Sequence, residues 1–154
     1  MSIVKHLRNL RSPSSLKKLS RYGPNNFVER LSTILFGSLV ATYLDLYFVG
    51  HGLYSFPMRP FPEIFSINIL FTLIVLPFSL YVYFSVISMI KGWKRTGLIL
   101  SLGMLAAVFE KFAEEQGWFS HQLNWHHYYT VFGFFIYLQL ITLVYFWFKQ
   151  LLRK

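Results

Sequence analysis

Long runs of apolar residues dominate this chain and are separated by short polar segments. Four such runs cover residues 31–50, 64–90, 97–113 and 127–148. An α-helix needs about 20 apolar residues to cross the roughly 30 Å hydrocarbon core of a bilayer. The first, second and fourth runs meet that length. The pattern therefore predicts an all-α membrane protein, a bundle of four transmembrane helices.

The second and third runs depart from the ideal length in opposite directions. Run 64–90 is longer than a bilayer requires and contains Pro77, so we expect tilt, or a kink where the ring removes a backbone donor. Run 97–113 is shorter and includes Glu110 and Lys111 near its end. An interfacial or re-entrant segment is the alternative for this third run, and it would leave an odd number of spans.

Small residues spaced four apart predict where the helices approach closely. Gly37 precedes Ala41 by four positions, and Gly103 precedes Ala107 by the same spacing. Such pairs let helix backbones come together, and packing within one chain is the favoured use here over dimerisation.

The charges lie in the short connecting segments and favour four spans. The net charge is +9, and 13 of the 15 Lys and Arg residues fall before residue 31, within 91–95 or after 148. With four spans these three segments share one side, leaving Arg59 and Lys111 for the other. Short loops rich in Lys and Arg stay cytoplasmic, so both ends of the chain are expected in the cytoplasm.

Residues 1–28 form a basic, partly amphipathic arm ahead of a transmembrane domain that spans residues 29–154. We expect the arm to lie on the anionic headgroups of the cytoplasmic face. A mitochondrial presequence has a similar composition and is the alternative. Nucleic-acid binding is not expected, because no recognised motif accompanies the charge. The residues expected at the membrane surface are Lys5, Arg8, Arg11, Lys17, Lys18 and Arg21.

Distances along the spans place several polar residues at one level in the outer leaflet. At 1.5 Å per residue, Asp45 lies about 21 Å along the first span and Glu110 about 20 Å along the third. The other half of the spans offers little except Gln139. The predicted polar or ion site consists of Asp45, Asn68, Glu110, Lys111 and Thr130.

Two interpretations of this polar layer are open. Ionisable groups inside a membrane are functional candidates by default, so the layer could be a protonatable or ion-binding pocket. It could instead fix helix register through an Asp45–Lys111 or a Glu110–Arg59 pair. The outer loop above it, residues 51–63, contains three prolines together with His51, Arg59 and Glu63. This composition predicts a stiff connector, or a lid over the layer.

Metal and enzyme chemistry find little support in the sequence. Glu114, His121 and His126 are suitable ligand types for zinc or iron, but their spacing matches neither HExxH nor repeated histidine boxes. Interfacial histidines beside Trp and Tyr more often belong to the aromatic belt. The chain has no cysteine, and it contains no nucleotide loop or nucleophile elbow. No cofactor and no catalytic residue is predicted.

Two stretches of the sequence resemble a known family. One is LDLYFVGHGLYSFPMRPFPEIFSINILFTLIVLP and the other begins FEKFAEEQGWF and continues through NWHHYYTVFGFFIYL. Together they resemble a family of uncharacterised small multi-pass membrane proteins of endospore-forming bacteria, named after a hypothetical clostridial protein. Its marks here are Asp45, Tyr54, Phe56, Pro57, Arg59, Pro77, Glu110, Gly117 and Trp125, whereas Thr130 stands where such proteins often have Ser. The resemblance implies a bacterial plasma membrane and brings no catalytic assignment.

The sequence thus predicts a small integral membrane protein that acts as a structural or partner-binding component of a bacterial plasma membrane. Its expected partners are the lipid bilayer and either another membrane protein or a second copy of the chain. The alternative is a transporter, or an ion- or proton-coupled protein, that uses Asp45 and Glu110.

Overall fold

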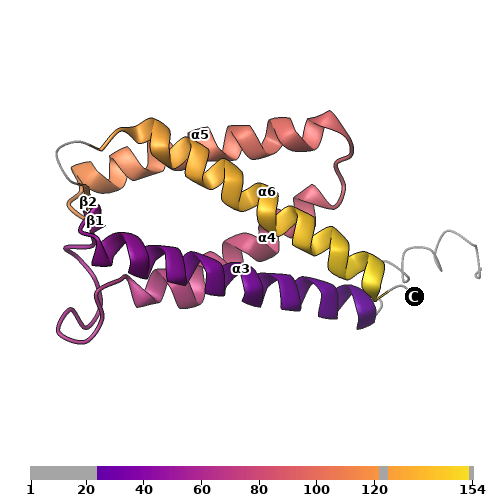
Figure 1. The fold of residues 1–154 in the computed structure, drawn as a ribbon, viewed down its shortest axis with the longest axis horizontal. Coiled ribbons are helices and arrows are strands. Elements are labelled where there is room, and N and C mark those ends of the chain that lie inside the picture. The colour runs from indigo at the N-terminus through magenta and orange to yellow at the C-terminus, as the bar shows by residue number, and fades with distance from the viewer. Residues whose placement is uncertain (1–23, 122–124, 153–154) are drawn as a thin grey trace, which may run out of the picture.

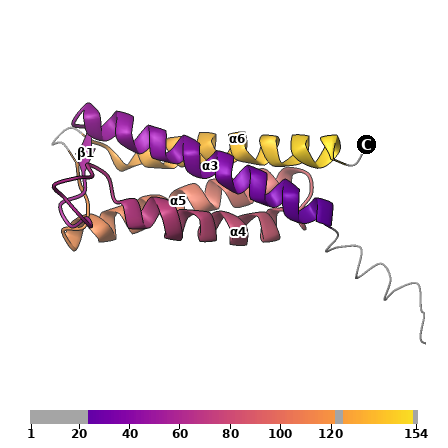
Figure 2. The same ribbon diagram turned by 90° about the horizontal axis from the view of Figure 1, so that it is seen from below.

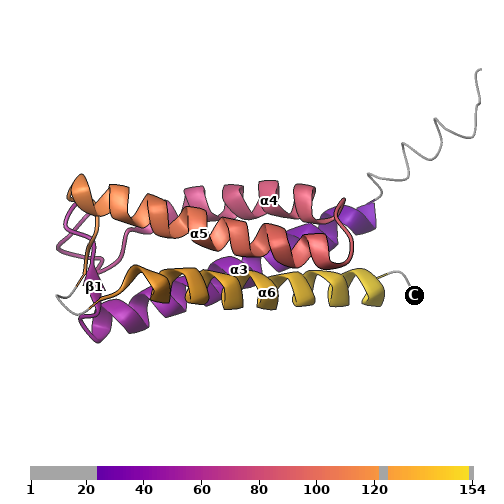
Figure 3. The ribbon, with the colours of Figure 1, turned by 90° about the horizontal axis from the view of Figure 1, so that it is seen from above.

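The computed structural model describes residues 24–121 and 125–152, with side chains from residue 27 onward. Four helical segments run lengthwise beside one another, as Figures 1, 2 and 3 show from three sides. They are α3 (Pro24–Gly50), the π-helical turn η2 (Phe71–Val75) continued by α4 (Leu76–Ile87), α5 (Trp93–Glu115) and α6 (His127–Leu151). The six basic arm residues listed above lie outside the described residues.

Three of these helices are long and apolar enough to cross a membrane, namely Phe27–Gly50, Trp93–Glu115 and His127–Leu151. The third run is therefore part of a helix of 23 residues, which extends beyond residues 97–113 at both ends. The fourth helical segment is shorter, because its apolar helical part covers only Phe71–Ile87. Residues 64–68, which the sequence placed inside this span, belong to the loop that precedes it.

The break expected at Pro77 takes the form of a π-helical turn. The Leu76 N–H donates to the carbonyl of Phe71, five residues back, and η2 leads directly into α4 with Pro77 in its first turn. A proline ring clashes with the carbonyl four residues earlier and has no N–H to bond it. Widening one turn to i→i+5 spacing relieves that clash without ending the helix.

The core of the bundle joins all four helical segments. α5 packs mainly on α6, α6 on α3, and α3 on α4. Gly37 and Gly103 lie at the tightest approaches: a Cβ on Gly37 would be 3.0 Å from Leu80 Cδ1, and one on Gly103 would be 3.0 Å from the Val131 carbonyl oxygen. The small residues therefore serve packing within the chain. The buried core consists of Ile34, Leu76, Leu80, Tyr83, Phe84, Ile87, Ile99, Leu138, Ile141 and Tyr145.

The two ends of the bundle differ in structure. At one end lie the first residues of α3, the last residues of α6 and the short α4–α5 connection (Figure 1). At the other end lie the long α3–η2 loop and a two-stranded antiparallel ribbon, β1 (Tyr54–Ser55) and β2 (Ser120–His121). We call these the loop-poor end and the ribbon end. The sequence-predicted polar residues lie towards the ribbon end.

Candidate functional site

Glycines at two helix ends direct the chain into the ribbon. After α3, Gly52 (φ 68°) donates to the Val49 carbonyl at 2.9 Å, and Leu53 donates to Phe48 at 3.0 Å. After α5, Gly117 (φ 72°) uses the same pattern with Glu114, and Trp118 donates to Ala113. These are Schellman motifs, which need a left-handed residue that glycine adopts without strain.

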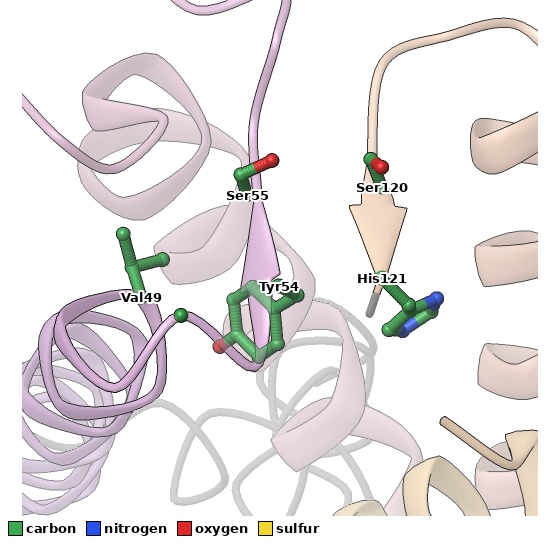
Figure 4. Close-up of a pocket in the computed structure, with 6 residues that line it drawn as sticks. Val49, Tyr54, Ser55, Ser120 and His121 are labelled. Carbon is green, nitrogen blue, oxygen red and sulfur yellow. The ribbon is translucent and has the colours of Figure 1, made fainter. Parts of the chain in front are cut away.

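The ribbon places Tyr54 directly opposite His121. The register pairs Tyr54 with His121 and Ser55 with Ser120. Because paired residues on antiparallel strands point to the same face, the two rings lie on one side of the ribbon, with centroids 6.4 Å apart. Val49, Tyr54 and His121, labelled in Figure 4, line a small pocket of about 210 Å³ together with Gly52, Ser55 and Ser120.

Asp45 finds its partner in this ribbon. The Tyr54 hydroxyl donates to Asp45 Oδ1 at 2.6 Å, linking the last turns of α3 to β1. The Tyr54 ring also contacts Phe119 and Trp125 at centroid distances of 5.0 and 6.2 Å. Burial, and then the negative charge of Asp45, raise the pKa of the Tyr54 hydroxyl well above its ordinary value. Tyr54 therefore remains a donor throughout the neutral range.

Glu110 collects donors from the start of α6 and the residues just before it. Its Oε1 accepts from Trp125 Nε1 at 3.3 Å and lies 3.0 Å from His127 Nδ1. Its Oε2 accepts from the Thr130 hydroxyl, whose residue is buried. The Glu110 side chain is only 10% exposed, so these donors replace the water that the carboxylate would otherwise bind.

His121 lies between two carboxylates. Its Nδ1 is 3.2 Å from Glu114 Oε1 and its Nε2 is 3.2 Å from Glu110 Oε1, while the imidazole is 4% exposed. The Nε2 contact lacks hydrogen-bond geometry, so within the described part of the chain this nitrogen has no hydrogen-bond partner. The ring stacks on Trp125 at 4.8 Å with a 12° interplanar angle, and meets the edge of Phe119 at 4.5 Å.

Other predicted site residues lie apart from this cluster. Asn68 uses its side-chain oxygen to accept from the Phe71 backbone at 3.2 Å, at the start of η2. Lys111 is exposed on α5. The two cations expected as partners of the acids are thus replaced by neutral donors: Tyr54 bonds Asp45, and Trp125 and Thr130 bond Glu110.

The outer-loop residues have structural contacts. Arg59 donates to the carbonyls of Phe56 and Phe65 at 2.7 Å each and to that of Pro62 at 3.3 Å. One guanidinium therefore holds three backbone carbonyls of the loop together, as a stiff connector requires. His51 packs its ring on Tyr47 at 4.5 Å. Glu63 is exposed.

The three predicted metal ligands do not come together. Glu114 contacts His121, but His126 stacks on Tyr128 at 5.3 Å. Among residues 24–121 and 125–152, no three His, Asp or Glu side chains are placed to hold one metal ion. Glu110 and Glu114 instead contact imidazole, indole and hydroxyl groups.

The structure also shows buried polar groups near the loop-poor end, where the sequence analysis singled out only Gln139. Glu29 is 1% exposed, and neither carboxylate oxygen has a hydrogen-bond partner among the described residues. Arg95 lies over the Phe146 ring at 4.0 Å and donates to the Ile90 carbonyl at 2.9 Å. Tyr83 and Thr142 share a buried hydrogen bond of 2.5 Å. Glu29, which lies two residues before the first apolar run, was not singled out from the sequence.

Comparison with known proteins adds no assignment, since no family model, curated protein or solved structure matches the chain.

Proposed function

We propose that this chain is a four-span protein of a bacterial plasma membrane, with both ends cytoplasmic, that acts as a non-catalytic structural or partner-binding component. The observation that carries the proposal is the arrangement at the ribbon end. There Asp45 and Glu110, the acids best placed for chemistry, are each bonded by donors of the same chain.

The exposed surface of the helices supports a lipid environment. Large apolar side chains point outwards along each helix, for example Leu39, Leu73 and Leu143, which are 58%, 69% and 68% exposed. Contiguous apolar surface on this scale marks contact with lipid or with another protein. The shorter helix Phe71–Ile87 rises about 26 Å at 1.5 Å per residue, which approaches the thickness of the hydrocarbon core. It is therefore the fourth span of the proposal.

The distribution of charge supports the proposed orientation. The loop-poor end carries Arg30, Lys91, Lys94, Arg95 and Lys149, whereas the ribbon end carries Arg59 and Lys111 among five acids, Asp45, Glu63, Glu110, Glu114 and Glu115. Basic connecting segments stay in the cytoplasm, so the loop-poor end faces inwards. There its cations meet anionic headgroups.

A single-cysteine labelling experiment tests the orientation, because the natural chain has no cysteine. Met58→Cys in the outer loop should react with an impermeant maleimide on intact cells. Lys91→Cys in the α4–α5 connection should react only after permeabilisation. The reverse pattern, or labelling of both sites on intact cells, contradicts the proposed topology.

Photo-crosslinking in cells tests the partner-binding role. A photoreactive residue at exposed Leu39, Leu73 or Leu143 should capture a discrete protein from at least one helix face, while the same residue at fully buried Ile141 should not. Lipid adducts alone at all three exposed positions contradict partner binding.

Vesicles containing the purified protein test the coupled-transport alternative. Under a pH or sodium gradient the proposal expects no flux above that of empty vesicles. A flux that Asp45→Asn or Glu110→Gln abolishes, with folding intact, establishes the transporter function instead.

A further inference from the structure

The placement of His121 between two carboxylates bears on how the ribbon end holds together. Its buried imidazole has Nδ1 facing Glu114 and Nε2 facing Glu110, each at 3.2 Å. A neutral imidazole has one N–H and one lone pair, whereas the imidazolium has two N–H donors. Only the charged ring can donate to both carboxylates. In the neutral ring, a lone pair faces one of the two anions.

The surrounding groups do not supply a substitute for this proton. From α5, Glu110 and Glu114 face the ring. From the start of α6, the His127 ring lies 6.0 Å away and its Nδ1 is already directed at Glu110. From β1 the Tyr54 ring lies 6.4 Å away, and its hydroxyl proton is committed to Asp45 on α3. The titratable neighbours are thus three acids, a tyrosine and one further imidazole.

The ring also connects separate parts of the fold. The β2 backbone that carries His121 pairs with β1, and so with the α3–η2 loop. Its side chain contacts α5 through Glu110 and Glu114, and it stacks on Trp125, just before α6. A change in the protonation of this ring therefore affects contacts of both the α3–η2 loop and the α5–α6 connection.

We propose that His121 is a proton-operated clasp. When the ring is protonated, its Nδ1–H bonds Glu114 and its positive charge attracts Glu110, 3.2 Å from Nε2, so the ring holds the ribbon against α5. When it loses the proton, one carboxylate faces a lone pair, and the ribbon and outer loop separate from α5. The clasp therefore responds to the pH on the side of the membrane that the ribbon end faces. This inference concerns regulation of the ribbon end; it rests on the proposed orientation for the medium that the ribbon end faces, and not on the proposed structural or partner-binding role.

Distance measurements between spin labels on the full chain in lipid nanodiscs test the clasp. Labels on Met58→Cys in the outer loop and Gln116→Cys after α5 report the separation, and both native residues are exposed. At the acidic end of a pH series we expect one narrow distance distribution. As the pH is raised, a broader and longer component should increase several-fold.

Matched variants assign that change to His121. His121→Gln replaces the imidazole by a neutral amide that does not titrate, so it should abolish the pH response. Glu114→Gln should weaken the response. His51→Gln, at an exposed histidine that packs on Tyr47, should keep the full response. An unchanged distribution across the range, or a response that persists in folded His121→Gln, overturns the clasp. If His121→Gln does not fold, a full response in Glu114→Gln overturns it equally.

Discussion

The Tyr54 hydroxyl lies 2.6 Å from Asp45 Oδ1 and joins the end of the first long helix to a two-residue strand. Both residues are half-buried, and both precede the second helical segment in the chain. This contact joins the start of the outer loop to the end of α3.

Removing the hydroxyl should therefore destabilise the protein measurably. Tyr54→Phe leaves the Asp45 carboxylate buried without its donor, and such a loss costs about 1–3 kcal/mol. Asp45→Asn should cost less, because a neutral amide tolerates the same environment better. Unfolding in mixed micelles checks both variants, with Tyr43→Phe on the exposed face of α3 as the control. Equal stability of Tyr54→Phe and wild type would show that the bond contributes nothing.

The raised pKa of Tyr54 predicts sensitivity to alkali. In the unfolded chain a tyrosine ionises near pH 10, whereas the folded protein keeps the Tyr54 proton to higher pH. The associated stability is complete below about pH 10 and is lost as the pH rises further, because unfolding then releases a proton. Melting temperatures measured across this range should fall more steeply for wild type than for Tyr54→Phe. Parallel curves would contradict the assignment.

Two glycines of α5 should respond oppositely to the same substitution. In Gly103→Ala the new methyl group would lie 3.0 Å from the Val131 carbonyl oxygen, so α5 and α6 must move apart. We expect a loss of about 1–3 kcal/mol. Gly97→Ala meets nothing within 4 Å and should gain up to about 1 kcal/mol from helix propensity. Reversible unfolding of both variants measures the contrast, and equal effects would refute the close approach.

The buried Glu29 should be replaceable by an apolar residue. Its two oxygens have no hydrogen-bond partner in the part of the chain that the structure describes, so burying its charge is not repaid by a bond. Glu29→Met keeps a similar volume and should raise stability by about 1–3 kcal/mol, the usual cost of a buried polar group without a hydrogen bond. Exposed Glu115→Met on α5 is the control and should change little. Marked destabilisation by Glu29→Met alone would mean that this carboxylate is stabilised in the fold.

The helices were predictable because their signals are local and repeat over many residues. The run that begins at His127 is a helix from that residue, and Gly37 and Gly103 do lie at close helix approaches. Rise per residue also placed Glu110 and Thr130 at one level, and the two side chains are in contact. A rigid helix preserves such depths, so counting residues along it is reliable.

The contacts of the ribbon end were harder to predict, because loops have no constant rise per residue from which positions can be counted. His121 reaches Tyr54 through strand register, and that register depends on the left-handed turns at Gly52 and Gly117. Glycine directly after a long apolar run was the available signal for those turns. Nothing local indicates that Tyr54, rather than Lys111, would bond Asp45. That choice depends on how the outer loop folds around Arg59.

The order in which the chain is made gives the β1–β2 ribbon a particular place in assembly. Tyr54 and Ser55 emerge from the ribosome before α4 and α5 are synthesised. They can pair only after Ser120 and His121 have been synthesised. Helices α3, α4 and α5 are therefore all synthesised before the ribbon can form, and α6 follows it. A chain truncated before residue 120 lacks both β2 and α6, so its helices have no ribbon across their ends.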